Sequence, residues 1–189
     1  MSDGTYTVLF LSQRNSARSI IAAALLNQIG RGRFRAFSAG VRPTQAYDAI
    51  ALELLDHAHV PRPDGAPQHY RSFAAADAPP LDFVFTLSDT AAGEPLPAWP
   101  GHPVTGHWSS GDPARFQNSE AERRRSLIGT RSQLERRLRI LVNLPLESLD
   151  RLSLQAQVDD IGRPAGDEEP HERDTKERGE SGSVGSPPS

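Results

Sequence analysis

A polar loop of eight residues carries the side chains best suited to bind an anion. A hydrophobic run from Thr7 to Leu11 ends there, and an amphipathic segment from Ile20 to Ile29 follows it. Backbone N–H groups of such a loop, the positive end of a following helix and a guanidinium can all point at one oxyanion. The same residues could also form an ordinary turn between a strand and a helix. The predicted oxyanion-binding loop consists of Ser12, Gln13, Arg14, Asn15, Ser16, Ala17, Arg18 and Ser19.

Strands and helices that alternate along the chain must position this loop. Short apolar runs predict strands at residues 7–11, 34–38, 81–87 and 102–108. Helical periodicity predicts helices at 17–29, 46–58 and 146–161, and a capping box from Ser119 to Glu122 opens another, longer helix. We therefore predict an α/β fold, a three-layer doubly wound domain built on a four-stranded parallel sheet. The loops after the strands, including residues 12–18 and 88–94, should share one edge of that sheet.

The composition divides the chain into a domain at residues 1–162 and a tail at residues 163–189. The tail is almost free of apolar residues and rich in Pro, Gly, Ser, Glu and Arg, which is typical of disorder.

A net charge of −3 and a pI of about 6.1 give no basis for binding nucleic acid or an anionic membrane. No apolar run reaches the ~18 residues of a membrane span. The first residues do not resemble a leader, so we expect a cytoplasmic protein.

The chain has no cysteine, which excludes disulfides, thiolate metal sites and thiol redox chemistry on its own residues. The pairs His57/His59 and His102/His107 could be metal ligands. Without a dense carboxylate cluster beside them we expect surface or structural histidines, and we predict no metal site and no cofactor. Arginines at 123–125 and 136–137 are interleaved with glutamates, and we expect them to form a solvated helix face.

Several motifs, in order, give the chain a family resemblance. They include the segment Val8-Leu9-Phe10-Leu11-Ser12-x-x-Asn15-Ser16-Ala17-Arg18-Ser19, the segments 34–40 and 82–86, Trp99-Pro100-Gly101 and Asp112-Pro113. Over about residues 6–162 the chain resembles the low-molecular-weight tyrosine phosphatase superfamily, and most of all its arsenate reductase branch. The family pattern is Cys-x5-Arg, and the resemblance implies that Arg18 binds the oxyanion and that Asp112 is the general acid. It also implies that Asn15 orders the loop and that Ser19 stabilises the nucleophile.

Ser12 stands where this family has its nucleophilic cysteine. Hydrogen bonds can bring a thiol pKa of about 8.5 well below 7, whereas an alcohol starts far higher and needs an adjacent base. The loop contains no His or Lys, although His102 or His107 could approach it in the fold. Ser88 matches a position where arsenate reductases of this branch often carry cysteine. Arg14 replaces the usual glycine and adds a positive charge to the loop.

We therefore expect an oxyanion-binding protein, for arsenate, phosphate or a phospho-ligand, with weak or no catalysis. Phosphotyrosine recognition is not expected, because Phe116 is the only aromatic residue shortly after Asp112-Pro113. Three alternatives remain open. Ser12 or water could serve an active hydrolase, the protein could be a regulatory or scaffold partner, or Ser12 and Ser88 could replace native cysteines. Asp112 could equally be a turn residue before proline.

Overall fold

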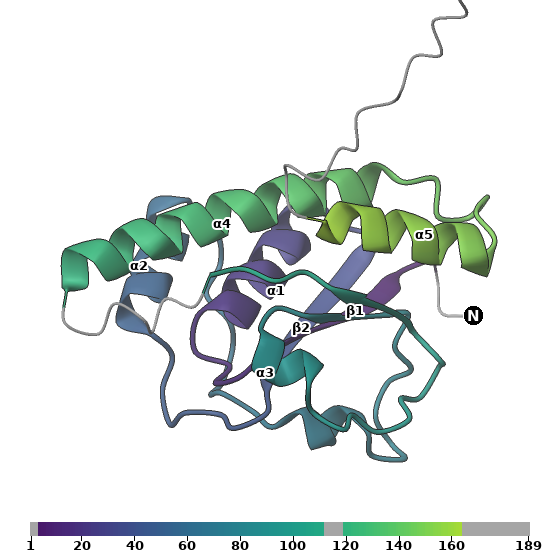
Figure 1. The fold of residues 1–189 in the computed structure, drawn as a ribbon, viewed down its shortest axis with the longest axis horizontal. Coiled ribbons are helices and arrows are strands. Elements are labelled where there is room, and N and C mark those ends of the chain that lie inside the picture. Colours follow the sequence, from purple (N-terminus) through teal and green to yellow (C-terminus); the bar gives the residue numbers. More distant parts are fainter. Residues whose placement is uncertain (1–3, 112–118, 164–189) are drawn as a thin grey trace, which may run out of the picture.

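The computed structural model describes residues 4–111 and 119–163, which form a layered α/β arrangement (Figure 1). Asp112, Phe116 and residues 164–189 lie outside the described residues, and so do the expectations placed on them. The elements, in chain order, are β1 (Tyr6–Ser12), α1 (Arg18–Ile29), β2 (Phe34–Gly40), α2 (Ala49–His57), the 3-10 helix η1 (Tyr70–Phe73), β3 (Phe83–Thr86), α3 (Asp89–Ala92), β4 (Val104–His107), α4 (Glu120–Asn143) and α5 (Arg151–Gly162).

The four strands form one sheet in the order β2-β1-β3-β4, and every neighbouring pair is parallel. β1 pairs with β2 from Tyr6 opposite Phe34 to Ser12 opposite Gly40. On its other side β1 pairs with β3, which in turn pairs with β4. The predicted four-stranded parallel sheet is confirmed. Because the strands are parallel, the segments that follow them meet at one edge of the sheet, and the polar loop after Ser12 is among them.

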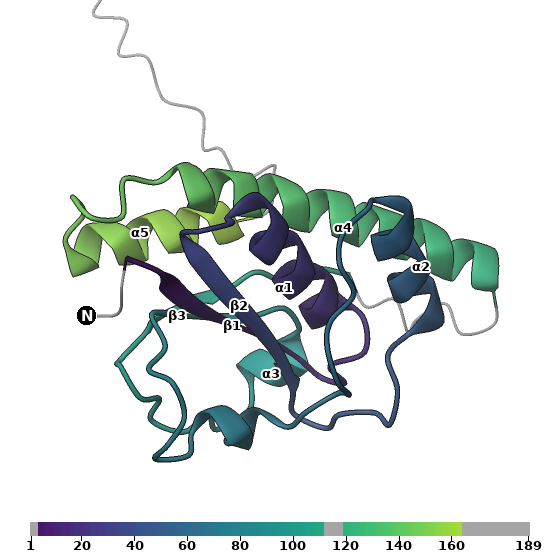
Figure 2. The same ribbon diagram turned by 180° about the vertical axis from the view of Figure 1, so that it is seen from behind.

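Successive residues of β1 point to opposite faces of the sheet and enter two separate cores. Val8 and Phe10 belong to the larger core, which α1, α2, α4 and α5 help to build. Leu9 and Leu11 belong to a smaller core that contains residues of η1 and α3 together with Trp99. Figures 1 and 2 show α4 and α5 on one side of the sheet and α3 on the other. Both faces of the sheet are thus covered, as the short, continuously apolar strands predict.

α1 is buried on all sides rather than along one stripe. Every residue from Arg18 to Leu26 is buried, although the sequence pattern indicated a single apolar face. The reason is tertiary, since α1 packs against β1 and β2 and also against α4. A helix enclosed in this way has little freedom to move. Its N-terminus, where the polar loop ends, is therefore held in a fixed position.

Several short features differ from the sequence expectation. α5 begins at Arg151 rather than at residue 146, because Asp150 caps it and accepts from the Ser153 amide at 2.8 Å. α2 begins at Ala49 rather than at residue 46, because Asp48 caps it and accepts from the Ala51 amide at 3.1 Å. The segment 88–94 contains a helical turn, α3, which Ser88 caps by accepting from the Ala91 amide at 3.2 Å. The element η1 was not predicted.

None of the helices within the described ranges is long and apolar enough to cross a bilayer.

The expectation that the arginines of α4 all face solvent is wrong for Arg137, which is only 6% exposed. Its guanidinium donates to the carbonyl oxygens of Ser109, at 3.1 Å, and Gly162, at 3.0 Å. These bonds satisfy the buried cation without a carboxylate partner. Arg123 and Arg124 are also only partly exposed, and they pair with Asp48 and Glu53 at the neighbouring helix α2.

Candidate functional site

The polar loop is held from its outer side by the segment that follows β2. Residues 41–48 run along the loop and donate backbone N–H groups to its carbonyl oxygens. The four bonds run from Val41 to Ser12 (3.1 Å), from Arg42 to Gln13 (2.8 Å), from Thr44 to Arg14 (3.1 Å) and from Asp48 to Ser16 (2.9 Å). Four carbonyls of the loop therefore face this segment.

The amide groups of the loop consequently point to the opposite, inner side. In a trans peptide unit an N–H is directed away from the carbonyl before it, and no peptide bond of the loop is cis. The amides of Gln13, Arg14, Asn15 and Ala17 thus face inward, and that of Asn15 donates to Ser12 Oγ at 3.1 Å. Within the described residues no carbonyl accepts from the other three. Inward amides of this kind form a nest that suits an anion.

Asn15 holds the sharpest bend of the loop. Its φ of 49° lies in the left-handed region, which asparagine tolerates better than most residues. Its side chain is fully buried, with Oδ1 accepting from Ser19 Oγ at 2.9 Å and Nδ2 donating to the Ser38 carbonyl at 3.4 Å. Gly40 lies against this bend, because a Cβ there would come within 2.8 Å of the Asn15 nitrogen. The bend therefore requires both the asparagine and the glycine.

The hydroxyl of Ser12 is hydrogen-bonded in a way that fixes its proton. Ser12 Oγ lies 2.8 Å from Ser19 Oγ. Ser19 has a single hydroxyl proton, which it donates to Asn15 Oδ1, so Ser12 must be the donor in the pair of hydroxyls. Ser12 also accepts from the Asn15 amide. Its proton thus points at a neutral hydroxyl, and among the described residues no histidine, carboxylate or other base accepts it.

Arg18, the first residue of α1, directs its guanidinium into the molecule. The residue is 8% exposed. Nη1 donates to the Leu87 carbonyl at 3.4 Å and to the Ser110 carbonyl at 3.2 Å, so the guanidinium bridges the loops that follow β3 and β4. One guanidinium thereby links the start of α1 to two of the other loops at this edge of the sheet.

A cavity of about 370 Å³ opens beside this guanidinium. Ser110 contributes a hydroxyl that is buried without a hydrogen-bond partner in the described structure. Ser88 lies in the same wall and is 4% exposed. A buried hydroxyl without a partner costs free energy unless a bound molecule or water satisfies it. The lining is polar throughout and consists of Gln13, Arg18, Ser88, Asp89, Thr90, Ser109, Ser110 and Gly111.

Arg137 holds the far wall of this cavity in place. It binds the Ser109 carbonyl, one residue before the carbonyl that Arg18 binds. Burial lowers the pKa of the Arg137 guanidinium, and the neighbouring charge of Arg136 lowers it further. Two arginines from different helices therefore fix the loop after β4 from opposite sides.

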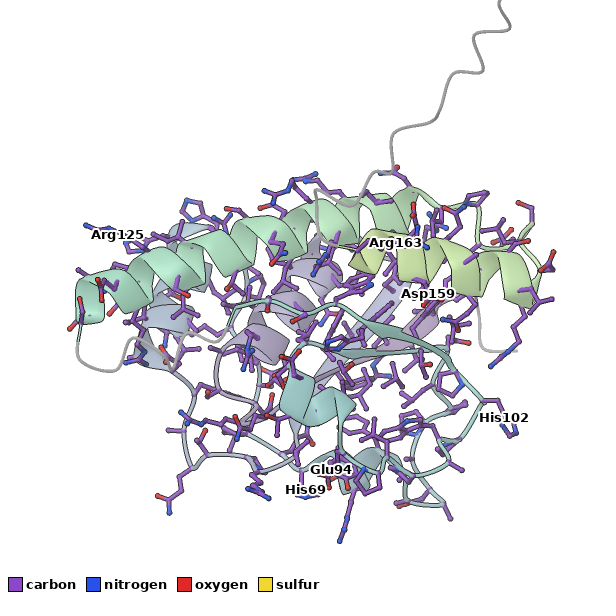
Figure 3. All side chains as sticks on the ribbon, in the orientation of Figure 1. His69, Glu94, His102, Arg125, Asp159 and Arg163 are labelled. Atoms are coloured by element: carbon purple, nitrogen blue, oxygen red, sulfur yellow. The ribbon has the colours of Figure 1, made fainter. Side chains whose placement is uncertain are left out.

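The predicted loop residues lie together in the structure, whereas the two histidines that could have approached Ser12 do not reach it. Arg14 is exposed. His107 does not reach Ser12, because its ring binds Thr86 Oγ1 at 2.8 Å and Asp89 Oδ1 at 3.3 Å. His102 precedes β4 and lies at the opposite edge of the sheet, as Figure 3 shows. The described residues contain no cluster of three or more His, Asp or Glu that could hold a metal ion.

Sequence reasoning missed Ser110, Arg137 and Gly40. The rule that loops after parallel strands form the site would have pointed to residues 108–111, because they follow β4. The spacing of Arg137, three residues after Leu134 and four before Leu141, places it on the apolar stripe of α4 and is the signal that could have found it. The general acid expected at Asp112 lies outside the described residues.

Comparison with known proteins agrees with this geometry. The profile of the family "Low molecular weight phosphotyrosine protein phosphatase" matches residues 7–153. No curated protein sequence matches the chain.

Solved structures with the same fold are arsenate reductases and phosphatases. The chain is similar to an arsenate reductase from Archaeoglobus fulgidus DSM 4304, with a TM-score of 0.54 and 24% identity over 69% of this chain and 98% of that one. It is similar to an arsenate reductase in its phosphate-binding state, with a TM-score of 0.56 and 21% identity over 73% and 97%. A low molecular weight phosphotyrosine phosphatase from Vibrio cholerae O395 matches with a TM-score of 0.51 and 19% identity over 67% and 90%.

Proposed function

We infer the function of this chain from its family, because the chain belongs to the low molecular weight phosphotyrosine protein phosphatases. We propose that it binds a tetrahedral oxyanion, such as phosphate or arsenate, or the phosphoryl group of a ligand, in the loop from Ser12 to Ser19. We further propose that it turns this ligand over weakly or not at all. One of the structures that share its fold is an arsenate reductase in its phosphate-binding state, which is in keeping with an anion at this place.

The inward direction of the loop amides is the observation that carries the proposal. Four carbonyls are bound on the outer side, and the amides of Gln13, Arg14 and Ala17 are left without a protein acceptor in the described residues. Gln13 and Arg18 line one cavity, and the N-terminus of α1 adds partial positive charge where the loop ends. A tetrahedral anion offers acceptors in several directions and can satisfy these donors together.

The same hydrogen bonds argue against turnover through Ser12. A serine becomes a nucleophile when a base removes its proton in the transition state. The Ser12 proton is donated to Ser19, whose hydroxyl is not a base. Arsenate reduction by thiols is also closed to this chain's own residues, because it has no cysteine. A general acid at Asp112, as the family pattern implies, would have no leaving group to protonate, because Ser12 starts no displacement.

Isothermal titration calorimetry with phosphate, arsenate and sulfate tests the proposal. We expect saturable binding of phosphate and arsenate by the full chain. Arg18→Met should weaken it at least about tenfold, since a charge-assisted contact is worth roughly 1.5–3 kcal/mol. Arg125→Met is the matched control, because Arg125 is an exposed arginine at the far end of α4 (Figure 3). A folded protein that binds none of the anions at millimolar concentration would refute the proposal.

A further inference from the structure

A second cleft, larger than the cavity beside Arg18, lies along the free edge of β2. Its volume is about 580 Å³, within the range of about 300–1,000 Å³ that small-molecule sites occupy. One wall comes from the C-terminal half of α1 and the opposite wall from residues 59–68. Three guanidinium groups line it, those of Arg31, Arg35 and Arg62.

The charge of this cleft favours an anionic occupant. Among the described residues neither Arg31 nor Arg35 has a carboxylate partner, and Arg35 lies over the Phe37 ring at 5.1 Å. Arg62 is paired with Asp56. Asp64 is the one carboxylate in the lining, so a net positive charge remains. Guanidinium groups with unused donors suit a carboxylate or a phosphate.

The cleft is not built to receive a β-strand. The outward N–H and C=O of Ala36, in the middle of β2, are both held by the side chain of Asn27, at 2.8 and 2.9 Å. The outward amide of Gly40 donates to the Gln68 carbonyl at 2.9 Å. An added strand would need these same groups. Recognition must therefore come from the side chains of the cleft.

The uncharged part of the lining suits a compact apolar body. Ala23 and Ala24 form part of the α1 wall, and Tyr47, Pro61 and Pro63 contribute to the rest. Burial raises the pKa of the Tyr47 hydroxyl, with a smaller contribution from Asp64, so this wall is neutral at physiological pH. An apolar surface rimmed by cations matches a small molecule that joins an aromatic or aliphatic body to one anionic group.

Residues that line this cleft also help to hold the loop from Ser12 to Ser19 in place. Tyr47 belongs to the segment 41–48, whose amides hold four loop carbonyls. The Ser38 carbonyl accepts from Asn15 on one side and from Gln68, a lining residue, on the other, each at 3.4 Å. A molecule that displaced Gln68 or Tyr47 would therefore act directly on the bend at Asn15.

We propose that this cleft is a second ligand site for a small organic anion, and that its occupancy changes the affinity of the loop for an oxyanion. The proposed binding of a small organic anion depends only on the residues of the cleft. The second half, the regulation, rests on the proposed function.

Binding is tested by NMR titration of the full chain with 1-naphthoate, with uncharged 1-naphthamide as the control ligand. We expect saturable shifts at the amides of Ala24, Phe37 and Tyr47 with naphthoate and none with naphthamide. The double variant Arg31→Gln/Arg35→Gln should bind naphthoate at least about tenfold more weakly, whereas Arg125→Gln should bind it like the wild type. Shifts that centre on Gln13 and Ser110, or equal affinity in the double variant, would overturn the cleft as the site.

Regulation is tested by titrating phosphate with and without saturating naphthoate. We expect the phosphate Kd to change at least about threefold, equivalent to ~0.65 kcal/mol of coupling, and the change to vanish in the double variant. An unchanged Kd with the cleft occupied overturns the regulation. If phosphate does not bind at all, the proposed function and the regulation both fail, and the naphthoate titration alone still decides whether the cleft is a ligand site.

Discussion

Replacing Ser12 with cysteine should convert the loop from Ser12 to Ser19 into a nucleophilic site. The new sulfur would lie where Ser12 Oγ accepts from the Asn15 amide and meets the Ser19 hydroxyl. The loop leads into the N-terminus of α1, whose partial positive charge also favours an anion there. Each of these groups stabilises a thiolate relative to a thiol, so the pKa of the introduced thiol should be far below its usual value.

The size of the gain follows from the ionised fraction. With an ordinary pKa of about 8.5, ~3% of a thiol is ionised at pH 7, and a decrease of ~3 units makes almost all of it thiolate. An alcohol has a far higher pKa than a thiol, so the same decrease would leave only about two molecules per million ionised. The ionised fraction then differs by ~10⁵ or more. Because an alkoxide is intrinsically the stronger nucleophile, we expect a gain of at least ~10³ in kcat/KM.

Hydrolysis of p-nitrophenyl phosphate at pH 7 measures this gain in Ser12→Cys. The rate of alkylation by iodoacetamide against pH gives the thiol pKa without interference, because the chain has no other cysteine. Ser16→Cys is the matched control, since residue 16 lies in the same loop but its side chain is not part of the Ser12–Asn15–Ser19 hydrogen bonds. A folded Ser12→Cys variant with an ordinary thiol pKa, and no more turnover than the wild type, would refute the claim that this loop stabilises an anion at position 12.

Three further changes probe the supports of the site and the fold. Gly40→Ala should lower phosphate affinity at least about tenfold, measured by calorimetry, because its Cβ would meet the Asn15 nitrogen at 2.8 Å and displace the bend. Arg137→Met should reduce the free energy of unfolding in urea by about 2–4 kcal/mol, because two backbone carbonyls lose their buried donor; an unchanged midpoint would contradict this. Asp150 caps α5, and hydrogen bonds from Ser153 lower the pKa of its carboxyl. Its stabilising contribution should therefore be complete above the carboxyl's ordinary pKa and be lost as the pH falls through the lowered value. Asp150→Asn should lose less stability than the wild type over that acidic range in thermal unfolding, and parallel pH profiles would argue against it.

The fold could be predicted because its signals are local. Short apolar runs and the residues that end them mark each strand, and Gly30 closes the helix that follows the loop. The start of α2 was misplaced for a tertiary reason. Asp48 stays outside the helix because its side chain caps α2 and its amide donates to the Ser16 carbonyl of the loop.

The candidate site was predicted only in part. The residue types of the loop indicated an anion site, since Asn15, Arg18 and Ser19 lie close together in the chain. Ser110 and Arg137 come from segments roughly 90 and 120 residues away, and only the packing of α4 and β4 brings them to the cavity. The residue type of Arg137 does not set it apart from the other arginines of α4, and only its spacing from Leu134 and Leu141 does. Its burial depends on the carbonyls that happen to lie opposite it.

Binding and chemistry depend on different atoms in this loop, so one can survive without the other. The donors for an anion are mostly backbone amides, whose direction is set by carbonyls bound to residues 41–48 and by the bend at Asn15. No single side-chain substitution at position 12 removes an amide. Nucleophilic attack, in contrast, depends on one atom and its proton. A serine at that position accepts from the Asn15 amide and donates to Ser19, so it supports the order of the loop although no base among the described residues accepts its proton. This separation is why we expect the anion to bind and the reaction to fail.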